Sequence, residues 1–339
     1  MASEFIEKGK GTLRVLVVTN MYPDAGRPAW GIFVQQQVES LRALGHQVDV
    51  LQVRGSDSKL EYLSAIRQVW RRTRQRAYHV VHAHYGLSGL SALFRWKTPL
   101  VVTLHGSDAL VGWLEPAVSR LVCRIAREVV AVSGQIAERF SGTVIPCGVD
   151  LDLFRPFDKA AARRRTGWPS SGRVVLFPYQ PDRQVKRFDL ASEAVQRLQA
   201  KGMEVRLQTV CDVPHAQMPF YYSASDAMVL CSDSEGSPTA LKEALACGLP
   251  VAATPVGNVP EIVRGVEIVE ICRQDAESLR AGLQRIIEQP ADSRARCRAR
   301  EKMRRFDQTA TAQALVEVYR RALSGQRTSG NTAVLSSPP

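Results

Sequence analysis

The chain has 339 residues, of which 45% are hydrophobic, so it is long enough for one or two domains with buried cores. Its seven cysteines form no C-x-x-C pair and no apolar run approaches the roughly 20 residues that span a bilayer, so we expect a cytoplasmic protein without disulfides, zinc or membrane spans. The net charge of +12 indicates an acidic ligand or surface as partner.

Short β-branched runs alternate with helical periodicity, a pattern typical of parallel sheets flanked by helices. A helix from about Ile32 to Leu44 is expected after the first strand and its Pro/Gly-rich loop. Gly31 stands at the N-terminus of this helix, where amides and the helix dipole favour a phosphate. No G-x-G-x-x-G occurs, which disfavours dinucleotide binding. Strands are expected in the first half at residues 13–18, 48–53, 80–84, 100–105, 129–133 and 144–146.

Three histidines lie at the carboxyl ends of two expected strands, where ligands bind in open α/β sheets. His82 and His84 close one strand, and His105 closes the next. They lack a carboxylate at ligand spacing, so no metal site is predicted. A structural or hydrogen-bonding role for His82 and His84 is the alternative.

The second half repeats the alternation after a polar linker. Its first loop crowds Arg183, Lys186 and Arg187 at the carboxyl end of a strand, and these charges suit a diphosphate. Solvated loop charges are the alternative interpretation. Further elements are expected as strands at residues 174–177, 226–230 and 267–271 and helices at residues 188–200 and 309–324.

Residues 235–250 read E-G-S-P-T-A-L-K-E-A-L-A-C-G-L-P. Ser237 is predicted as N-cap, Pro238 as first helical residue and Gly248 as the stop, which gives a helix of about ten residues. Its apolar stripe leaves Lys242 and Glu243 on the opposite side, so an ordinary surface helix with a charged outer face is one interpretation. The amides that follow Glu235 would instead suit an anion or a hydroxyl-rich ligand.

The E-x7-E spacing, the following G-L-P-V-x-x-T, and the segments T-L-H-G-S-D and I-P-C-G-V-D resemble retaining glycosyltransferases of family 4 over nearly the whole chain. The resemblance implies an α/β GT-B fold, with two Rossmann-like doubly wound domains and an interdomain cleft. It implies transfer of a sugar from a UDP- or GDP-sugar to an acceptor hydroxyl, with retention and without metal or cofactor. The acceptor would be a sugar or lipid-linked molecule in cell-surface polysaccharide or glycolipid biosynthesis.

The same resemblance suggests domain bounds and site roles. An acceptor-side domain spans 12–153, a nucleotide-sugar-binding domain spans 154–308, a helix at 309–324 crosses back, and 325–339 form a disordered tail. The residues expected to act are His105 on the transferred sugar, Lys186 and Arg183 on the leaving diphosphate, Glu235 on the sugar hydroxyls, and Gly31, Gly236, Ser237, Pro238, Thr239 and Glu243 as donor-binding residues, with Glu243 on the ribose.

Two departures from the family pattern are visible. Cys147 stands where the family has asparagine, which weakens a ligand-holding role for that side chain. Pro178 and Tyr179 stand where the family has G-R, so Arg183 is a candidate substitute for the missing arginine.

Two other functions remain open. A nucleotide-sugar 2-epimerase would use similar phosphate contacts but needs no acceptor. A nucleic-acid-binding protein would explain the charge, but the chain has no recognisable binding module, so we expect no nucleic-acid partner.

The basic stretch from Lys59 to Arg76 is predicted to dock on an anionic membrane surface. Leu63, Ile66 and Trp70 repeat at helical spacing among arginines. The alternative is that this stripe packs on the first domain's sheet while the arginines are only solvated.

Overall fold

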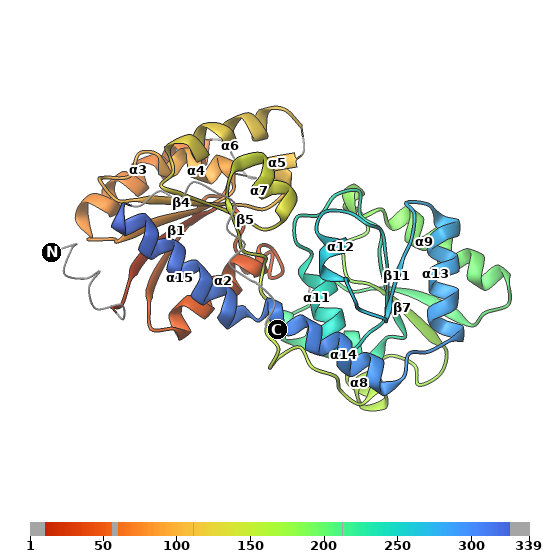
Figure 1. The fold of residues 1–339 in the computed structure, drawn as a ribbon. Coiled ribbons are helices and arrows are strands. Elements are labelled where there is room, and N and C mark those ends of the chain that lie inside the picture. Colours follow the sequence, from red (N-terminus) through yellow and green to blue (C-terminus); the bar gives the residue numbers. More distant parts are fainter. Residues whose placement is uncertain (1–10, 56–59, 111, 212, 326–339) are drawn as a thin grey trace. The chain divides into compact units, whose positions relative to one another are not determined.

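The computed structural model describes residues 11–55, 60–110, 112–211 and 213–325 (Figure 1). The predicted disordered tail lies outside them, apart from Gly325, as does Lys59. The chain divides into two compact units. Unit 1 contains the residues up to Asp24, Trp30–Gly148 and those from Gln308, and unit 2 contains Ala25–Ala29 and Val149–Asp307. Within the described ranges, every helix is too short or too polar to cross a membrane.

Unit 1 is built on a parallel sheet with the strand order β2-β1-β3-β4-β5-β6. Its central strands are almost wholly buried because both faces of the sheet are covered, which explains their continuous apolar runs. The order reverses between β1 and β3, and ligands bind at such switch points in open α/β sheets. The strands are β1 (Arg14–Thr19), β2 (Gln47–Gln52), β3 (Val80–His84), β4 (Leu100–Leu104), β5 (Glu128–Ala131) and β6 (Thr143–Val144).

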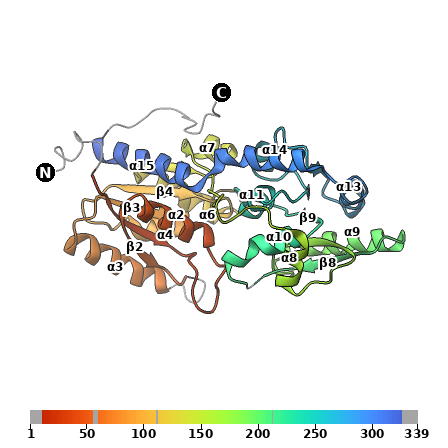
Figure 2. The same cartoon turned by 90° about the horizontal axis from the view of Figure 1, so that it is seen from below.

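Helices cover both faces of this sheet. α2 (Ile32–Ala43) and α15 (Gln308–Ser324) lie side by side on one face, which Figure 2 views directly. Tyr319 of α15 is fully buried there with Val38 and Leu41. The opposite face carries α3 (Leu60–Gln75), α4 (Gly86–Ala92), α6 (Leu114–Ile125) and α7 (Gly134–Phe140), and α5 (Ser107–Leu110) follows β4 (Figure 1).

Unit 2 has a second parallel sheet, with the order β11-β10-β9-β7-β8 and a reversal between β7 and β9. The register pairs Val175 with Ala227 across this switch point. Both faces are again buried in apolar side chains. The strands are β7 (Arg173–Phe177), β8 (Val205–Thr209), β9 (Ala227–Leu230), β10 (Val251–Ala253) and β11 (Val269–Ile271).

The helices of unit 2 also form two layers (Figure 1). α9 (Phe188–Ala200) and α13 (Ala276–Glu288) pack on one face. The other face carries α10 (Met218–Ala224), α11 (Thr239–Ala246), α12 (Val259–Ile262) and α14 (Ser293–Met303), and α8 (Lys159–Thr166) packs against α10.

The start of α11 corrects one prediction. The helix begins at Thr239 and has eight residues, with Pro238 rather than Ser237 at the N-cap. Ser237 does not cap because its hydroxyl accepts a hydrogen bond from Lys242 instead. Gly248 follows the helix with a φ of 71°, the left-handed conformation expected of a C-terminal glycine.

Gly31 provides a test of how tightly the loop after β1 is packed. Its φ is 73°, and a Cβ there would lie 2.3 Å from the carbonyl carbon of Met21. Gly45 has a similar φ of 87° with open space around it. Gly45→Ala should therefore cost only the left-handed strain of about 1–2 kcal/mol. Gly31→Ala should cost about 1–3 kcal/mol more, because the backbone must move.

Urea unfolding of both variants measures the difference in the free energy of unfolding. An equal loss in the free energy of unfolding in both variants would contradict this prediction, because it would show that the loop after β1 makes room for the added Cβ without cost.

Candidate active site

The switch point of unit 2 brings two loops together at the carboxyl ends of β7 and β9. The loop after β7 contains a 3-10 turn, η1 (Gln184–Lys186), and the loop after β9 contains Glu235. The Lys186 Nζ lies 2.5 Å from Glu235 Oε1, and the side chains are only 8% and 10% exposed. Ser232 Oγ donates to the same carboxylate oxygen at 2.7 Å. The ammonium also lies 4.2 Å from the ring centroid of Tyr179, so a charged pair is fixed at this switch point.

The three basic residues of the first loop have different environments. Lys186 is buried with Glu235, whereas Arg187 forms ion pairs with Asp189 and Asp233. Arg183 is exposed, just before η1. The solvated-loop interpretation therefore fails for Lys186 and fits Arg183.

Helix α11 carries two buried charges. Lys242 is fully buried, and its Nζ donates to Ser237 Oγ at 2.9 Å. Glu243 is 4% exposed. The alternative interpretation, an ordinary surface helix with a charged outer face, is therefore wrong, because α10 and α14 cover the side of α11 that faces away from the sheet.

The partners of Glu243 come from α10 and the turn before it. Tyr222 donates its hydroxyl to Glu243 Oε2 at 2.9 Å, and His215 Nε2 lies 2.9 Å from Oε1. Tyr222 is itself buried, and burial together with Glu243 raises its pKa well above the usual value. The tyrosine hydroxyl therefore remains protonated as a donor. Spacing in the sequence did not reveal either partner, since both lie more than twenty residues from Glu243.

A glycine fixes the backbone at Glu235. Gly257, in the loop after β10, has a φ of 55°, and a Cβ there would lie 2.0 Å from the carbonyl oxygen of Glu235. The two loops can pack this closely only because residue 257 has no side chain. Gly236, Ser237 and Pro238 then connect Glu235 to α11, and Thr239 opens the helix.

The histidines of unit 1 form a row of rings. The His84 Nδ1 lies 2.9 Å from His105 Nε2, so one ring donates a hydrogen bond to the other. His82 is held by the hydroxyls of Tyr319, at 2.8 Å, and Thr103, at 2.7 Å. His82 thus has a structural role. A cavity of about 10 Å³, room for about one water molecule, borders His84 and His105.

The His105 ring lies between two aromatic rings. The ring centroids of Phe33 and Tyr85 are 4.8 and 4.7 Å from that of His105. Phe33 is in the first turn of α2, two residues after Gly31, so the structure brings the predicted phosphate-binding turn beside the predicted sugar-binding histidine.

Asp108 holds the loop that carries His105. One carboxylate oxygen accepts hydrogen bonds from the amides of His105 and Gly106, both at 3.0 Å, and the other accepts from the amide of Gly86 at 3.2 Å. Burial raises the pKa of Asp108 to about 6, although these amides lower it. The loops after β3 and β4 are thereby joined. Among the described residues, no group of three or more His, Cys, Asp or Glu side chains is arranged to hold a metal ion.

Comparison with known proteins places the chain in a family. The model described as Glycosyltransferase Family 4 matches residues 14–153, and the one described as Glycosyl transferases group 1 matches residues 190–304. A D-inositol 3-phosphate glycosyltransferase from Thermobispora bispora is 31% identical over 310 residues, covering 73% of this chain and 71% of the relative. The chain belongs to glycosyltransferase family 4. A putative teichuronic acid biosynthesis glycosyltransferase, TuaC of Bacillus subtilis, is 27% identical. The match covers 80% of this glycosyltransferase and 89% of TuaC.

Solved structures agree on the fold. Sucrose-phosphate synthase from Thermosynechococcus elongatus has a TM-score of 0.76 and 21% identity, over 93% of this transferase and 100% of that chain. Anabaena HepE in complex with UDP-glucose has a TM-score of 0.64 and 17% identity, over 90% of this transferase and 99% of the HepE chain. The predicted GT-B class with two Rossmann-like domains is confirmed, and the interdomain cleft stays a prediction.

The buried histidines predict a pH dependence of stability. Burial lowers the pKa of His84 to about 3 and holds the pKa values of His82 and His105 well below 6.5. As the pH falls through about 6.5, each of these three histidines takes up a proton in the unfolded chain but stays neutral in the folded chain. Stability should therefore fall from pH 7.5 toward pH 6, by up to about 1.4 kcal/mol per pH unit for each histidine. The raised pKa of Asp108 has the opposite effect, because the folded chain takes up this proton more readily than the unfolded chain. It offsets the loss of stability only below about pH 6.

Nuclear magnetic resonance titration checks the cause directly. The ring signals of His82, His84 and His105, assigned by substitution with glutamine, should keep neutral-imidazole shifts down to pH 5.5. A ring that titrates near pH 6.5 would contradict this explanation.

Proposed function

We propose that this glycosyltransferase moves a sugar from a nucleoside diphosphate sugar to an acceptor hydroxyl, with retention of anomeric configuration. The observation that carries the proposal is the buried pair of Lys186 and Glu235 at the switch point of unit 2. Of the two expected donors, a UDP-sugar and a GDP-sugar, the likeness to HepE, solved with UDP-glucose, supports the UDP-sugar.

Lys186 is proposed to stabilise the leaving diphosphate. Negative charge on the diphosphate grows as the glycosidic bond to the sugar breaks, and a preorganised ammonium lowers the energy of that state. Glu235 holds the ammonium in place before the donor arrives. Exposed Arg183 would add to this stabilisation without a metal or other cofactor. The amides near Gly31 are proposed to bind a phosphate in their own right.

The remaining predicted residues are proposed to orient the donor. Glu243 would accept hydrogen bonds from the ribose with the lone pairs that Tyr222 and His215 leave open. Glu235 and the backbone from Gly236 to Thr239 would bind hydroxyls of the transferred sugar. His105, with its pKa lowered by burial, would meet this sugar as a neutral hydrogen-bonding ring rather than as a cation.

The acceptor is proposed to be an anionic or lipid-linked sugar of the cell surface. Of the named relatives, one is a D-inositol 3-phosphate glycosyltransferase and the other a putative teichuronic acid biosynthesis glycosyltransferase. The net charge of +12 favours an acidic acceptor or surface in the cytoplasm.

An exposed apolar face on unit 1 supports docking on the inner surface of a membrane. Leu63 and Trp70 of the predicted stripe are 63% and 42% exposed, and Ile66 is half-buried. The buried stripe of α3 consists instead of Ala65, Val69 and Thr73. α3 and α6 both lie against α4. We call the exposed sides of α3 and α6, with the loops that follow α4 and precede α6, the α3–α6 face. The exposed apolar residues on these segments are Leu60, Leu63, Trp70, Phe94, Trp96, Trp113, Leu114, Leu121 and Ile125.

Arginines add positive charge to the α3–α6 face. The guanidinium of Arg74 lies 5.0 Å from the ring centroid of Trp70 and 5.9 Å from that of Trp96, which joins α3 to the loop after α4. Arg67 and Arg71 are also exposed. Apolar side chains surrounded by arginines suit an anionic lipid surface.

Replacing Lys186 with methionine tests the reaction. Lys186→Met should lower kcat on the order of 100-fold with a smaller change in KM, because the charge acts in the transition state. Lys186→Arg should retain more turnover because it keeps the charge. Thermal melting confirms the fold of both variants, since an unpaired Glu235 is destabilising.

A raised KM with normal kcat in Lys186→Met would contradict this role. Incubation of the wild-type enzyme with donor alone distinguishes a transferase from a nucleotide-sugar 2-epimerase. Only the epimerase would convert the donor into its epimer when no acceptor is present.

Vesicle co-sedimentation tests the membrane proposal. Binding should require phosphatidylglycerol, fall as salt rises, and drop by more than tenfold in the triple variant Arg67→Gln, Arg71→Gln, Arg74→Gln, since each arginine contributes about 1 kcal/mol. A matched control replaces Arg285, Arg298 and Arg304 of unit 2 with glutamine. Equal binding to phosphatidylcholine vesicles, or equal losses in both triple variants, would overturn the proposal.

A further inference from the structure

Unit 2 contains a cavity of about 390 Å³ at the edge of its sheet opposite to Lys186 and Glu235. Arg173 opens β7 and Asp226 precedes β9, so the cavity lies at the amino ends of these strands. Its apolar wall includes Phe157, Leu249 and Ile286. The volume falls within the roughly 300–1,000 Å³ range of small-molecule sites.

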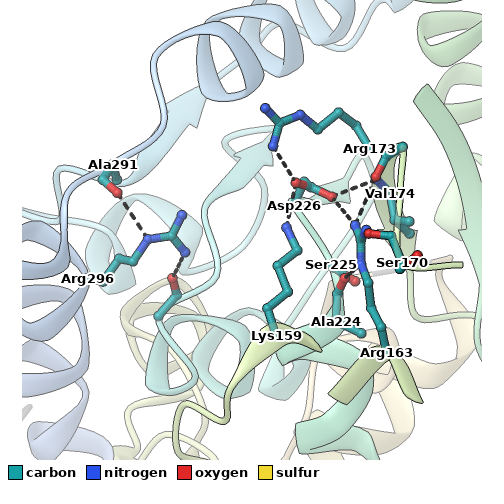
Figure 3. Close-up of polar contacts among 12 residues, drawn as sticks. Lys159, Arg163, Ser170, Arg173, Val174, Ala224, Ser225, Asp226, Ala291 and Arg296 are labelled. Carbon is teal, nitrogen blue, oxygen red and sulfur yellow. Dashed lines mark hydrogen bonds and ion pairs between the residues drawn. The ribbon is translucent and has the colours of Figure 1, made fainter. Parts of the chain in front are cut away.

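A single carboxylate faces several cations at this cavity. Asp226 is the only acidic residue among the described residues that line it. Lys159, Arg163 and Arg173 converge on Asp226 at 2.6, 2.9 and 3.1 Å, as Figure 3 shows. Two cations of this group are therefore left without a matching negative charge.

Two more arginines on α14 line the cavity. Arg296 donates to the carbonyls of Ala291 and Gly248 through Nε and Nη1 (Figure 3). Arg300 donates only to carbonyls, among them that of Ala246. These arginines lie at the C-terminus of α11, where the helix dipole favours a cation. The carbonyls are neutral, however, so both charges add to the excess at the cavity.

Burial and, for Lys159, charge repulsion both disfavour the charged state of cations at this cavity. The pKa of Lys159 is lowered, first by burial and also by repulsion from Arg163 and Arg173, in spite of Asp226. Burial lowers the pKa of Arg296 as well. The neighbouring acids Asp158 and Asp292 cap α8 and α14 through backbone amides. A bound anion would relieve the repulsion that these capping acids leave in place.

We propose that this cavity binds a small molecule with a phosphate monoester dianion and an apolar or ring-shaped body. The dianion would lie between Lys159, Arg173 and Arg296, and the body would pack against Phe157 and Ile286. The lysine and arginines supply charge-assisted donors for phosphate oxygens. The site is separate from the proposed donor site, because Lys186 and Glu235 lie at the other end of the same strands.

Calorimetry with phenyl phosphate tests the proposal. The probe should bind the full chain more tightly than inorganic phosphate, while phenol should not bind. Lys159→Met and Arg173→Gln change partly exposed side chains and should each weaken the binding of phenyl phosphate at least tenfold. Arg298→Gln on the same helix as Arg296 is the control, because Arg298 pairs with Glu267 and does not line the cavity.

Cysteine alkylation locates the probe independently of substitutions. Cys297 is an exposed thiol that lines the cavity. Phenyl phosphate should slow its alkylation, measured by mass spectrometry, and uridine diphosphate should not. Absence of binding at millimolar concentration, displacement of phenyl phosphate by uridine diphosphate, or unchanged affinity in both cavity variants would each overturn the proposal.

Discussion

The ion pair between Lys186 and Glu235 determines how the loops of unit 2 are arranged. Both side chains are nearly buried, and removal of one partner from such a pair costs about 3–5 kcal/mol. The loops after β7 and β9 must therefore stay together at the switch point. Gly257 adds a second constraint, since its loop packs against the backbone of Glu235. A positive charge is thus held in place before any ligand binds, which is the condition for electrostatic stabilisation of a leaving group.

Much of the fold could be predicted because its strands and helices have regular patterns. The expected helix at 188–200 and strand at 80–84 have the same bounds as α9 and β3. The buried residues of α9 recur at helical spacing, and every residue of β3 is buried. The short α11 was predicted less well. Its eight residues carry a lysine and a glutamate that the helical pattern assigned to solvent, whereas packing of α10 and α14 buries both.

The partners of the site residues could not be predicted, because they too depend on how one element packs on another. Tyr222 and His215 contact Glu243 through the packing of α10 on α11, and His84 contacts His105 through the pairing of β3 with β4. These contacts join residues more than twenty positions apart, and one sequence contains no record of them. The expected residues at strand ends were easier to find, because the carboxyl edge of a parallel sheet follows from the alternation of strands and helices.

The central claim is that Glu243 and the Lys186 loop hold the nucleoside diphosphate of the donor. Calorimetry of uridine and guanosine diphosphate with Glu243→Gln tests it most directly, with the surface variant Glu267→Gln as control. The account predicts a 10- to 100-fold loss of affinity for the preferred nucleotide, corresponding to about 1.5–3 kcal/mol for a charge-assisted hydrogen bond. Unchanged affinity in a variant that melts like the wild type would contradict it.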